Sequence, residues 1–209
     1  MNSKTEKYPR TYHLSFSPEI HGDDKVIHDK YLGHFLDTEI VISEKIDGGN
    51  CAIVLNDGVF ARSHAQATSC PTFDYIKNVH YFAKMHLLNP DYKYFGENMF
   101  AIHSIEYTNL EDYFYLFNIL DSKKGVWLDW EGVVKEAERL GFKTVPVRFK
   151  GKVSSILEVK DFMDKEILNE SVLGGNCEGF VLRIAGEVQA EDFSQYFAKY
   201  VRHGHVQTD

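Results

Sequence analysis

Hydrophobic positions in the first third of the chain form short β-branched runs separated by turns. The runs TEIVISEKI (38–46) and CAIVL (51–55) flank the turn-rich segment DGGN and are typical of strands. The sequence NDG (56–58) then indicates a tight hairpin whose return strand is GVFARS (58–63). The pattern therefore predicts a strand, a glycine turn and a β-hairpin in succession.

Helical spacing replaces this alternation in three later segments. After Pro71 the segment 73–88 predicts an amphipathic helix, and 129–141 predicts a second one that Gly141 ends. The segment 153–168 predicts a third. The apolar positions of the first helix are Phe73, Ile76, Val79, Ala83 and Leu87.

Strand patterns fill the rest of the chain, at 92–102, 112–120, 177–184 and 194–202. No repeat, low-complexity tract or Pro/Gly/Ser-rich linker divides it. We therefore expect one α+β domain over residues 1–209, with antiparallel sheets flanked by helices. We expect no separate C-terminal nucleic-acid-binding domain in this chain.

Composition narrows the class of protein. The chain has 209 residues, of which 44% are hydrophobic, enough for a sizeable core and too many for intrinsic disorder. Its three cysteines contain no CxxC pair, which argues against a disulfide framework or a cysteine-built zinc site. The start lacks an apolar signal region, and no run is long enough to span a membrane. We expect a cytoplasmic, reducing location and no membrane partner.

The net charge of −8 argues against a protein that coats nucleic acid through a wholly basic surface. One local run, KTVPVRFKGK (143–152), nevertheless carries four basic residues and no acid. It fits either a solvated strand edge or a patch in which Arg148 and Lys150 contact phosphate or RNA. The sequence leaves both readings open.

The segment EKIDGGN (44–50) is the first candidate for chemistry. A lysine at a strand end before a glycine turn can reach into a cleft, and it is a nucleophile once its amine is neutral. Asp47 and Asn50 would point into the same cleft. The alternative is a charged turn with a surface Lys45, because KxDG alone is a weak signal.

Two further candidates lie on the next strands. Arg62 in ARSH ends the hairpin's return strand, where a guanidinium can grip phosphate or ribose. Glu97 in FGEN follows a glycine and can bond sugar hydroxyls or hold a metal. A surface arginine and an ordinary strand carboxylate are the simpler alternatives.

The last three candidates are an aromatic strand and two charged strands. Alternation in YFYLFNI puts Tyr113, Tyr115 and Phe117 on one face, where one ring could stack on a base and the others pack in the core. Glu178 in CEGFVLRI fits a metal-holding carboxylate, and Lys199 in AKYVR is a cation near the chain end. Individually, both charges also suit an edge strand.

Taken in order, EKIDGGN, ARSH, FGEN, YLFNI, CEGFVLRI and AKYVR resemble the covalent nucleotidyltransferase superfamily of RNA ligases, DNA ligases and mRNA capping enzymes. The series is most similar to the nick-sealing "RNA ligase 2" type and covers residues 38–202. The resemblance implies an ATP-grasp-like nucleotidyltransferase domain with the ATP cleft between its sheets.

The resemblance also implies a role for each matching position. Lys45 would attack the α-phosphate of ATP and hold AMP as a lysyl phosphoramidate. A divalent cation, Mg²⁺ or Mn²⁺, would be held by Glu178, with Glu97 as a second carboxylate. The other ATP- or AMP-binding positions are Glu44 and Phe117 at adenine, Asp47 in the turn, Asn50 near the α-phosphate and the nick, Arg62 at the sugar–phosphate region, Glu97 at the ribose and Lys199 at the α-phosphate oxygens.

Two departures from the family pattern stand out. The last motif usually has a second lysine where this chain has Val201, so Arg202 or His203 would have to supply that charge. The chain then ends at GHVQTD, whereas related ligases add a module that grips nucleic acid. We expect either a compact enzyme or a shortened chain that relies on a separate substrate-delivery domain or protein.

The predicted function is that of an ATP-dependent RNA ligase that joins 5′-phosphate and 3′-hydroxyl ends of a nicked or broken RNA through lysyl-AMP. Three alternatives stay open at this point. They are an ATP-dependent DNA ligase with the same chemistry, an mRNA capping guanylyltransferase that uses GTP, and a non-catalytic nucleotide- or RNA-binding module.

Overall fold

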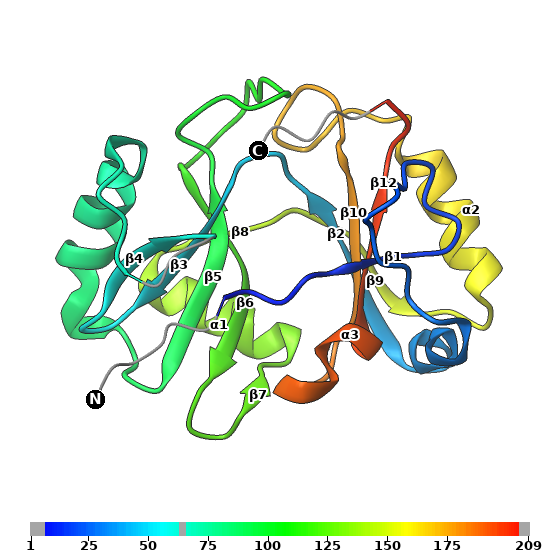
Figure 1. Cartoon of the computed structure of the whole chain (residues 1–209), viewed down its shortest axis with the longest axis horizontal. Coiled ribbons are helices and arrows are strands. Elements are labelled where there is room, and N and C mark those ends of the chain that lie inside the picture. Colours follow the sequence, from blue (N-terminus) through cyan, green and yellow to red (C-terminus); the bar gives the residue numbers. More distant parts are fainter. Residues whose placement is uncertain (1–6, 63–65, 205–209) are drawn as a thin grey trace.

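Two β-sheets face each other across the middle of the molecule (Figure 1), as seen in a computed structural model that describes residues 7–62 and 66–204. The first sheet has five strands, and only β1 and β12 pair in parallel. Its order is β1 (Tyr12–His13), β12 (Phe197–Val201), β10 (Gly179–Ile184), β2 (Glu39–Lys45) and β9 (Val147–Lys152).

The second sheet has seven strands. Its main path runs through β11 (Val188–Gln189), β7 (Val126–Trp127), β6 (Phe114–Asp121), β5 (Tyr92–Asn98), β3 (Gly49–Val54) and β4 (Gly58–Ala61), and β8 (Lys143–Thr144) pairs with β6. The predicted NDG hairpin is confirmed, because Val54 pairs with Gly58 and Asn56 adopts a φ of 69°. Ser63 and His64 of the ARSH motif lie outside the described residues.

The helices that the sequence predicts at 129–141 and 153–168 are both present. In α1 (Trp130–Leu140) the Asp129 side chain caps the start by accepting a hydrogen bond from the Gly132 amide at 2.9 Å. Gly141 ends that helix with a φ of 62°. The other helix, α2 (Ile156–Glu166), starts after Ser155 and is shorter than predicted. Shorter helical turns are η1 (Asp29–Phe35), η5 (Ala190–Asp192) and α3 (Phe193–Tyr196).

The amphipathic helix predicted for 73–88 is wrong in type and in phase. The segment folds as a 3₁₀ turn η2 (Pro71–Phe73), a π-helical turn η3 (Ile76–Tyr81) and a 3₁₀ turn η4 (Phe82–Leu87). A π turn widens the spacing of contacts, so His80 and Tyr81 turn inward while Val79, Ala83 and Leu87 are exposed.

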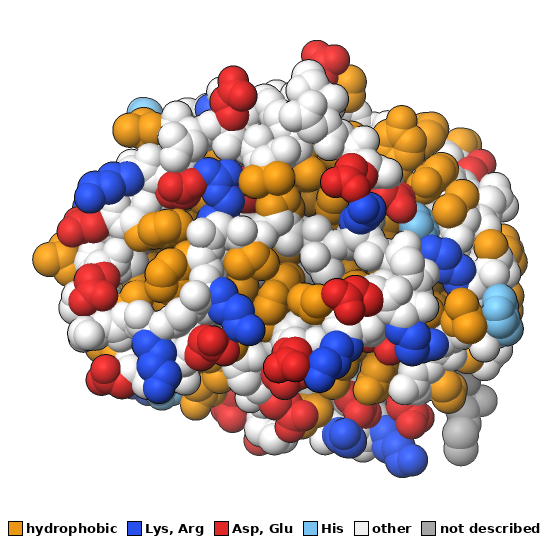
Figure 2. Space-filling model, turned by 180° about the vertical axis from the view of Figure 1, so that it is seen from behind, with side chains coloured by type: hydrophobic (Ala, Val, Ile, Leu, Met, Phe, Trp, Pro, Cys, Tyr) orange, Lys and Arg blue, Asp and Glu red, His pale blue; other side chains and the backbone are white. Residues whose placement is uncertain are grey.

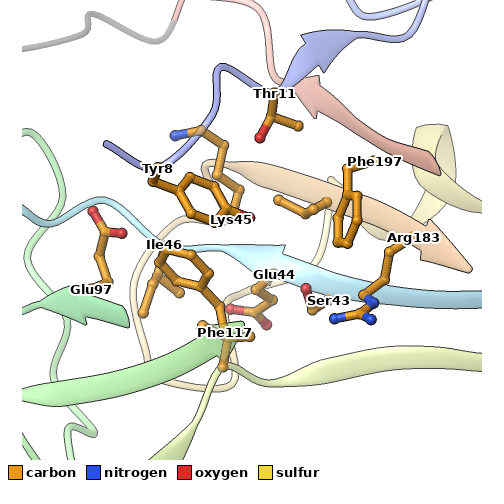
Figure 3. Close-up of a pocket in the computed structure, with 12 residues that line it drawn as sticks. Tyr8, Thr11, Ser43, Glu44, Lys45, Ile46, Glu97, Phe117, Arg183 and Phe197 are labelled. Atoms are coloured by element: carbon orange, nitrogen blue, oxygen red, sulfur yellow. The ribbon is translucent and has the colours of Figure 1, made fainter. Parts of the chain in front are cut away.

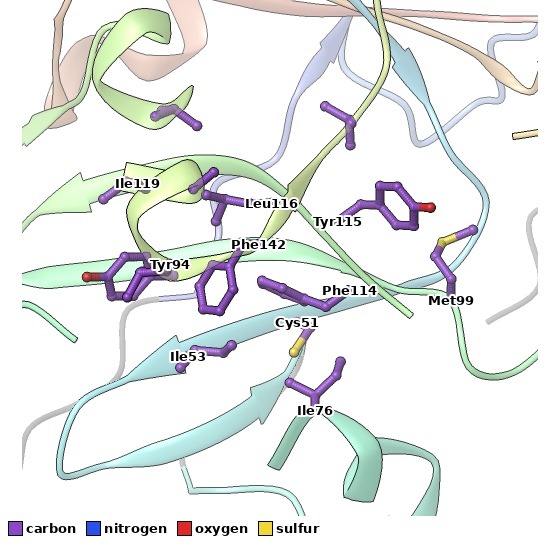
Figure 4. Packing of buried hydrophobic residues seen from close by; sticks show 14 of the residues in the cluster. Cys51, Ile53, Ile76, Tyr94, Met99, Phe114, Tyr115, Leu116, Ile119 and Phe142 are labelled. Carbon is purple, nitrogen blue, oxygen red and sulfur yellow. The ribbon is translucent and has the colours of Figure 1, made fainter. Parts of the chain in front are cut away.

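Separate hydrophobic clusters pack against the two sheets. On the seven-stranded sheet, Ile53, Tyr94 and Phe114 pack with Phe142 and with Ile76 of η3 (Figure 4). On the five-stranded sheet a second cluster packs against α2; its buried members include Ile40, Ile42, Phe180, Leu182, Ala198 and Tyr200. Because strand side chains alternate between faces, the intervening residues face the space between the sheets.

Charged side chains of both signs are interspersed on the face of the molecule shown in Figure 2, where the described lysines and arginines alternate with acidic residues. This mixture agrees with the net charge of −8. No helix within residues 7–62 and 66–204 combines the length and hydropathy that a bilayer-spanning segment needs.

Candidate active site

The register of three neighbouring strands places two lysines on one face of the five-stranded sheet. Lys45 of β2 lies opposite Gly179 of β10, which lies opposite Val201 of β12. The next row on that face contains Lys199 of β12. The two lysines of the EKIDGGN and AKYVR motifs, 154 positions apart in sequence, are thereby directed toward the same space.

A cavity occupies this space and is lined by both sheets (Figure 3). Its volume is about 640 Å³, including its solvent-open mouth. The five-stranded sheet contributes Lys45, Val181 and Arg183, and the seven-stranded sheet contributes Glu97 and Phe117. Residues from four of the predicted motifs therefore meet in one cleft.

The amine of Lys45 forms an ion pair with the carboxylate of Glu178, whose side chain is only 1% exposed. Burial lowers the pKa of Lys45, but the nearby carboxylates of Glu178, Glu97 and Asp47 outweigh it, so the pKa of Lys45 is raised above its usual value. The amine is therefore charged in this arrangement. It must give up a proton before it can act as a nucleophile.

Carboxylates outnumber cations immediately around Lys45. Burial, with added repulsion from Glu178 and Asp47, raises the pKa of Glu97 to about 8. Such crowded carboxylates suit a divalent cation, and oxygen donors are what Mg²⁺ and Mn²⁺ prefer. In the described part of the chain no group of three or more His, Cys, Asp or Glu side chains is placed to hold a metal. A cation on Glu178 and Glu97 alone would have to take its other ligands from a bound molecule or from water.

Lys199 lies close to a small ionic cluster at the edge of the cleft. Its Nζ is 3.9 Å from Oδ1 of Asp24, and Oδ2 of Asp24 is 3.3 Å from Nε2 of His13. Burial, together with repulsion from Lys45, lowers the pKa of Lys199 to about 8. Its position suits a cation that meets an anionic ligand in the cleft.

A β-bulge directs Phe117 into the cavity. In the pairing of β5 with β6, Phe95 faces Asn118 and Gly96 faces Leu116, which leaves Phe117 as the extra residue. The expectation that Tyr113, Tyr115 and Phe117 share one face is therefore wrong. Tyr115 belongs to the hydrophobic cluster that packs with Phe142, whereas Phe117 lines the cavity.

Two acidic residues of the EKIDGGN motif accept hydrogen bonds that hold the fold together. Oδ2 of Asp47 accepts hydrogen bonds from the Ser104 amide at 2.8 Å and the Ser104 hydroxyl at 2.6 Å, so this carboxylate holds a loop and does not line the cavity. The Glu44 carboxylate accepts from Arg148 at 2.6 Å and from the Ser171 hydroxyl at 2.5 Å. Glu44 thus supports the fold through these bonds while it also lines the cavity.

Asn50 and Arg62 both lie near Glu97. Asn50 is opposite Glu97 in the pairing of β3 with β5. Arg62 is exposed just after β4, and its charge partly offsets the rise in the pKa of Glu97. In FGEN the glycine allows close packing inside the protein, since a Cβ on Gly96 would lie 2.4 Å from the Phe114 ring.

The basic run 143–152 forms part of a strand edge. It is divided between β8 and β9, and β9 is the last strand of the five-stranded sheet. Its cations pair with acids: Lys143 with Glu111, Arg148 with Glu44 and Glu166, and Lys150 with Glu39. The solvated-edge interpretation therefore describes this run better than a free phosphate patch.

The two cations at the end of the chain's last motif, Arg202 and His203, differ in their burial. The Arg202 amide donates to the Glu178 carbonyl at 3.0 Å, and Nε of Arg202 is buried without a hydrogen-bond partner among the described residues. His203 is exposed and lies 3.2 Å from Glu19. Val201 is buried. Arg202 is therefore the more buried of the two cations, and neither is among the residues that line the cavity.

Sequence reasoning missed Arg183, although it lies within CEGFVLRI. This arginine is 3% exposed and connects the two sheets, because Nη1 donates to Oδ1 of Asn118 at 3.2 Å and Nη2 donates to the Leu128 carbonyl at 2.6 Å. Burial lowers its pKa to about 10. The signal that could have identified Arg183 is an arginine within an otherwise apolar strand, because such a charge is rarely buried without a partner.

Replacing Gly179 with alanine should disrupt the site from within the sheet. A Cβ at Gly179 would lie 2.1 Å from the backbone oxygen of Tyr200, so β10 and β12 would have to separate beside Lys45. We expect a loss of about 1–3 kcal/mol in the free energy of unfolding. Chemical denaturation measures it. Gly186→Ala is the control, because its nearest neighbour would be a side-chain atom at 4.0 Å; equal stabilities of the two variants would contradict this account.

Comparisons with known proteins agree with this geometry. The chain matches Naegleria gruberi RNA ligase, in a mutant structure with ATP and Mn, with a TM-score of 0.64 and 14% identity over 97% of this chain and 58% of that one. It matches an archaeal ATP-dependent RNA ligase with a TM-score of 0.61 and 14% identity, over 94% of this chain and 48% of that one. The chain thus spans only about half the length of each of these two proteins.

Sequence comparison gives the family directly. A search of curated proteins found no significant match. The profile of the RNA ligase family, however, matches residues 38–201, which contain every motif from EKIDGGN to CEGFVLRI and all of AKYVR except Arg202. The α+β fold, the cleft between two sheets and this match lead to one conclusion: the chain belongs to the RNA ligase family.

Proposed function

We propose that this chain is the adenylyltransferase part of an ATP-dependent RNA ligase, with Lys45 as the residue that becomes covalently linked to AMP. The observation that carries the proposal is the placement of the Lys45 amine in the cleft, against Glu178 and in the same cavity as Glu97 and Phe117. Both structural relatives described above are ATP-dependent or ATP-bound RNA ligases, which supports ATP as the nucleotide.

In the first step the neutral amine of Lys45 attacks the α-phosphorus of ATP. A P–N bond forms, the bond from the α-phosphorus to the bridging oxygen breaks, pyrophosphate leaves and the amine loses a proton. Because Lys45 is charged while paired with Glu178, binding of the nucleotide must loosen that ion pair. Lys199, on the same face, would stabilise negative charge on the α-phosphate oxygens.

The later steps return Lys45 to its starting form. An oxygen of an RNA 5′-phosphate attacks the phosphorus of lysyl-AMP, the P–N bond breaks and the lysine regains a proton. A 3′-hydroxyl then attacks the 5′-phosphate of the adenylylated strand, which releases AMP and forms a phosphodiester. Positioning and charge neutralisation dominate such transfers, which suits a cleft lined by fixed cations and carboxylates.

Glu178 and Glu97 are the residues proposed to hold a divalent cation. When bound, such a cation would neutralise charge on the phosphates of ATP. Glu97 is also near enough to Phe117, across one cavity, to meet the ribose of a nucleotide whose base lies on that ring. These assignments combine the resemblance to the family with the positions of the side chains.

RNA with a nick or break is the proposed partner. Three cations of the basic run 143–152 are paired with acids, so delivery of RNA by a further domain or protein is part of the proposal. All three cysteines are free thiols, which supports a reducing compartment such as the cytoplasm.

The test is incubation of the purified chain with radiolabelled ATP or GTP and Mg²⁺ or Mn²⁺, followed by intact-mass and peptide analysis. We expect a mass increase of one AMP, located on Lys45, with ATP only. Joining of 5′-phosphate RNA and of the same sequence as DNA then distinguishes the two ligase classes. A GMP adduct, or no adduct with either nucleotide, would reject the proposal.

Phe117→Ala should weaken ATP binding by about 1–3 kcal/mol if the ring stacks on adenine. Phe117 is half-buried and lines the cavity, so a bound ligand can cover the part of the ring that is still exposed. The affinity for ATP, from calorimetric titration, and the melting temperature are measured on the same variant. Phe162→Ala is the control, because its ring packs on Phe149 in the other cluster. A lower melting temperature with unchanged ATP affinity would return Phe117 to a purely structural role.

A further inference from the structure

The chain ahead of the first motif runs from one sheet to the other and lines the cleft. Residues 7–13, which we call the strap, begin on the seven-stranded sheet at Tyr8 and end in β1, which pairs with β12 of the other sheet. Figure 1 shows the strap as the blue trace that runs from β6 to β1. The family profile starts at residue 38, so it assigns the strap no role.

Tyr8 holds one end of the strap in a cage of aromatic rings. Its ring centroid lies 5.0–5.4 Å from those of Phe95, Phe117, Trp127 and Phe193. Its hydroxyl accepts a hydrogen bond from Nδ2 of Asn118 at 3.3 Å, and the same Asn118 accepts from Arg183. These contacts give the ring one defined position.

Ion pairs hold the other end. Nη2 of Arg10 lies 3.2 Å from Asp23 and 3.3 Å from Asp24, and the Asp24 side chain is only 8% exposed. His13 contacts the second oxygen of Asp24 at 3.3 Å. The strap is therefore fastened to both sheets, and its residues Tyr8 and Thr11 form part of the wall of the cleft.

The part of the strap that faces the cavity has the chemistry of a nucleoside site. Tyr8 and Thr11 both line the cavity that contains Lys45, Glu97 and Phe117 (Figure 3). Burial raises the pKa of Tyr8, so its hydroxyl is neutral and keeps its proton. Within residues 7–62 and 66–204 no acceptor is recorded for that proton, which leaves it available to a ligand oxygen or nitrogen.

We propose that Tyr8 is a nucleotide-binding residue, which contacts the base or ribose of ATP beside Phe117. The inference rests on the proposed function and deepens it. A neutral ring with one hydrogen-bond donor matches the nucleoside part of the ligand and offers nothing to the triphosphate. The phosphates are left to Lys45, Lys199 and the proposed cation.

Tyr8→Leu should therefore weaken ATP binding and raise the KM for ATP in lysyl-AMP formation, each by roughly tenfold. The kcat should change by less than about threefold, and affinity for inorganic tripolyphosphate should stay the same. Tyr8→Phe keeps the ring and should show a smaller increase in KM. Tyr12→Leu is the matched control, since Tyr12 belongs to the same strap but packs on the outer cluster with α2.

The experiment titrates ATP and tripolyphosphate into the 209-residue chain and the three variants, and measures adduct formation by intact mass and unfolding by heat. Hydrogen–deuterium exchange of the strap in the unaltered chain is a second measurement. It needs no variant, so the inference can be tested even if Tyr8→Leu does not fold. We expect ATP, but not tripolyphosphate, to slow exchange in residues 7–13.

Three results would overturn the inference while the unaltered chain still forms lysyl-AMP. They are unchanged ATP affinity in Tyr8→Leu, tighter ATP binding, which would make the ring an obstruction, and equal losses for ATP and tripolyphosphate. Exchange in the strap that ATP does not slow would also contradict it. An unaltered chain that forms no adduct would instead reject the proposed function.

Discussion

Replacement of Lys45 by alanine is expected to abolish the AMP adduct, to less than about one thousandth of the level in the unaltered chain. Lys45 is proposed to form the P–N bond itself, so no neighbouring cation substitutes for it. The measurement is incorporation of labelled AMP, checked by intact mass. Because Glu178 is buried and pairs with Lys45, we also expect a lower melting temperature.

A second variant separates chemistry from stability. Lys45→Arg retains a cation for Glu178 but cannot lose its proton, so it should keep most of the stability and still form no adduct. Lys135→Ala, at an exposed position of α1, is the control for removal of a lysine and should react normally. Labelled AMP that remains on either Lys45 variant would refute the assignment of Lys45.

Glu178→Gln is expected to slow lysyl-AMP formation by at least about 100-fold. The change keeps the shape of the side chain but removes the charge that faces Lys45 and that is proposed to hold the divalent cation. The rate of adduct formation is measured across a series of Mg²⁺ and Mn²⁺ concentrations. If the cation is held here, saturation should require more metal than in the unaltered chain.

Two comparisons test that explanation. Glu131→Gln changes an exposed carboxylate of α1 and should leave the rate and metal dependence unaltered. An excess of chelator should stop the reaction of the unaltered chain. Rapid adduct formation by Glu178→Gln, or full activity in chelator, would show that the carboxylate and the cation are not needed in the way proposed.

Local patterns were sufficient for most strands, and the order of the motifs was sufficient for several residues of the cleft. Short apolar runs rich in β-branched residues marked 38–46, 51–55 and 177–184, and each overlaps a strand of the structure. The order of motifs identified Lys45, Glu97, Glu178 and Lys199, which the two sheets bring near one another. A charged residue within an apolar strand is rarely buried without a partner, so it can be recognised in the sequence as a candidate for a functional role.

The direction of several side chains was decided by contacts between distant segments. Phe117 enters the cavity because β6 has one extra residue relative to β5 at this point. Such a bulge shifts which side chains share a face, and the simple alternation of residues in the sequence does not predict it. Asp47 serves the fold because its acceptor sites meet Ser104, 57 residues away. The helix expected at 73–88 became π and 3₁₀ turns where it packs on the sheet.

By itself, then, the sequence determined the α+β class, the order of the motifs and the residues able to do chemistry, because these follow from local periodicity and residue type. The tertiary structure alone decided the pairing of Lys45 with Glu178, the joining of the sheets by Arg183 and the strap that carries Tyr8 across the cleft. Tyr8 meets Asn118 at a separation of 110 residues. Contacts over such distances depend on how whole sheets pack, which no local pattern encodes.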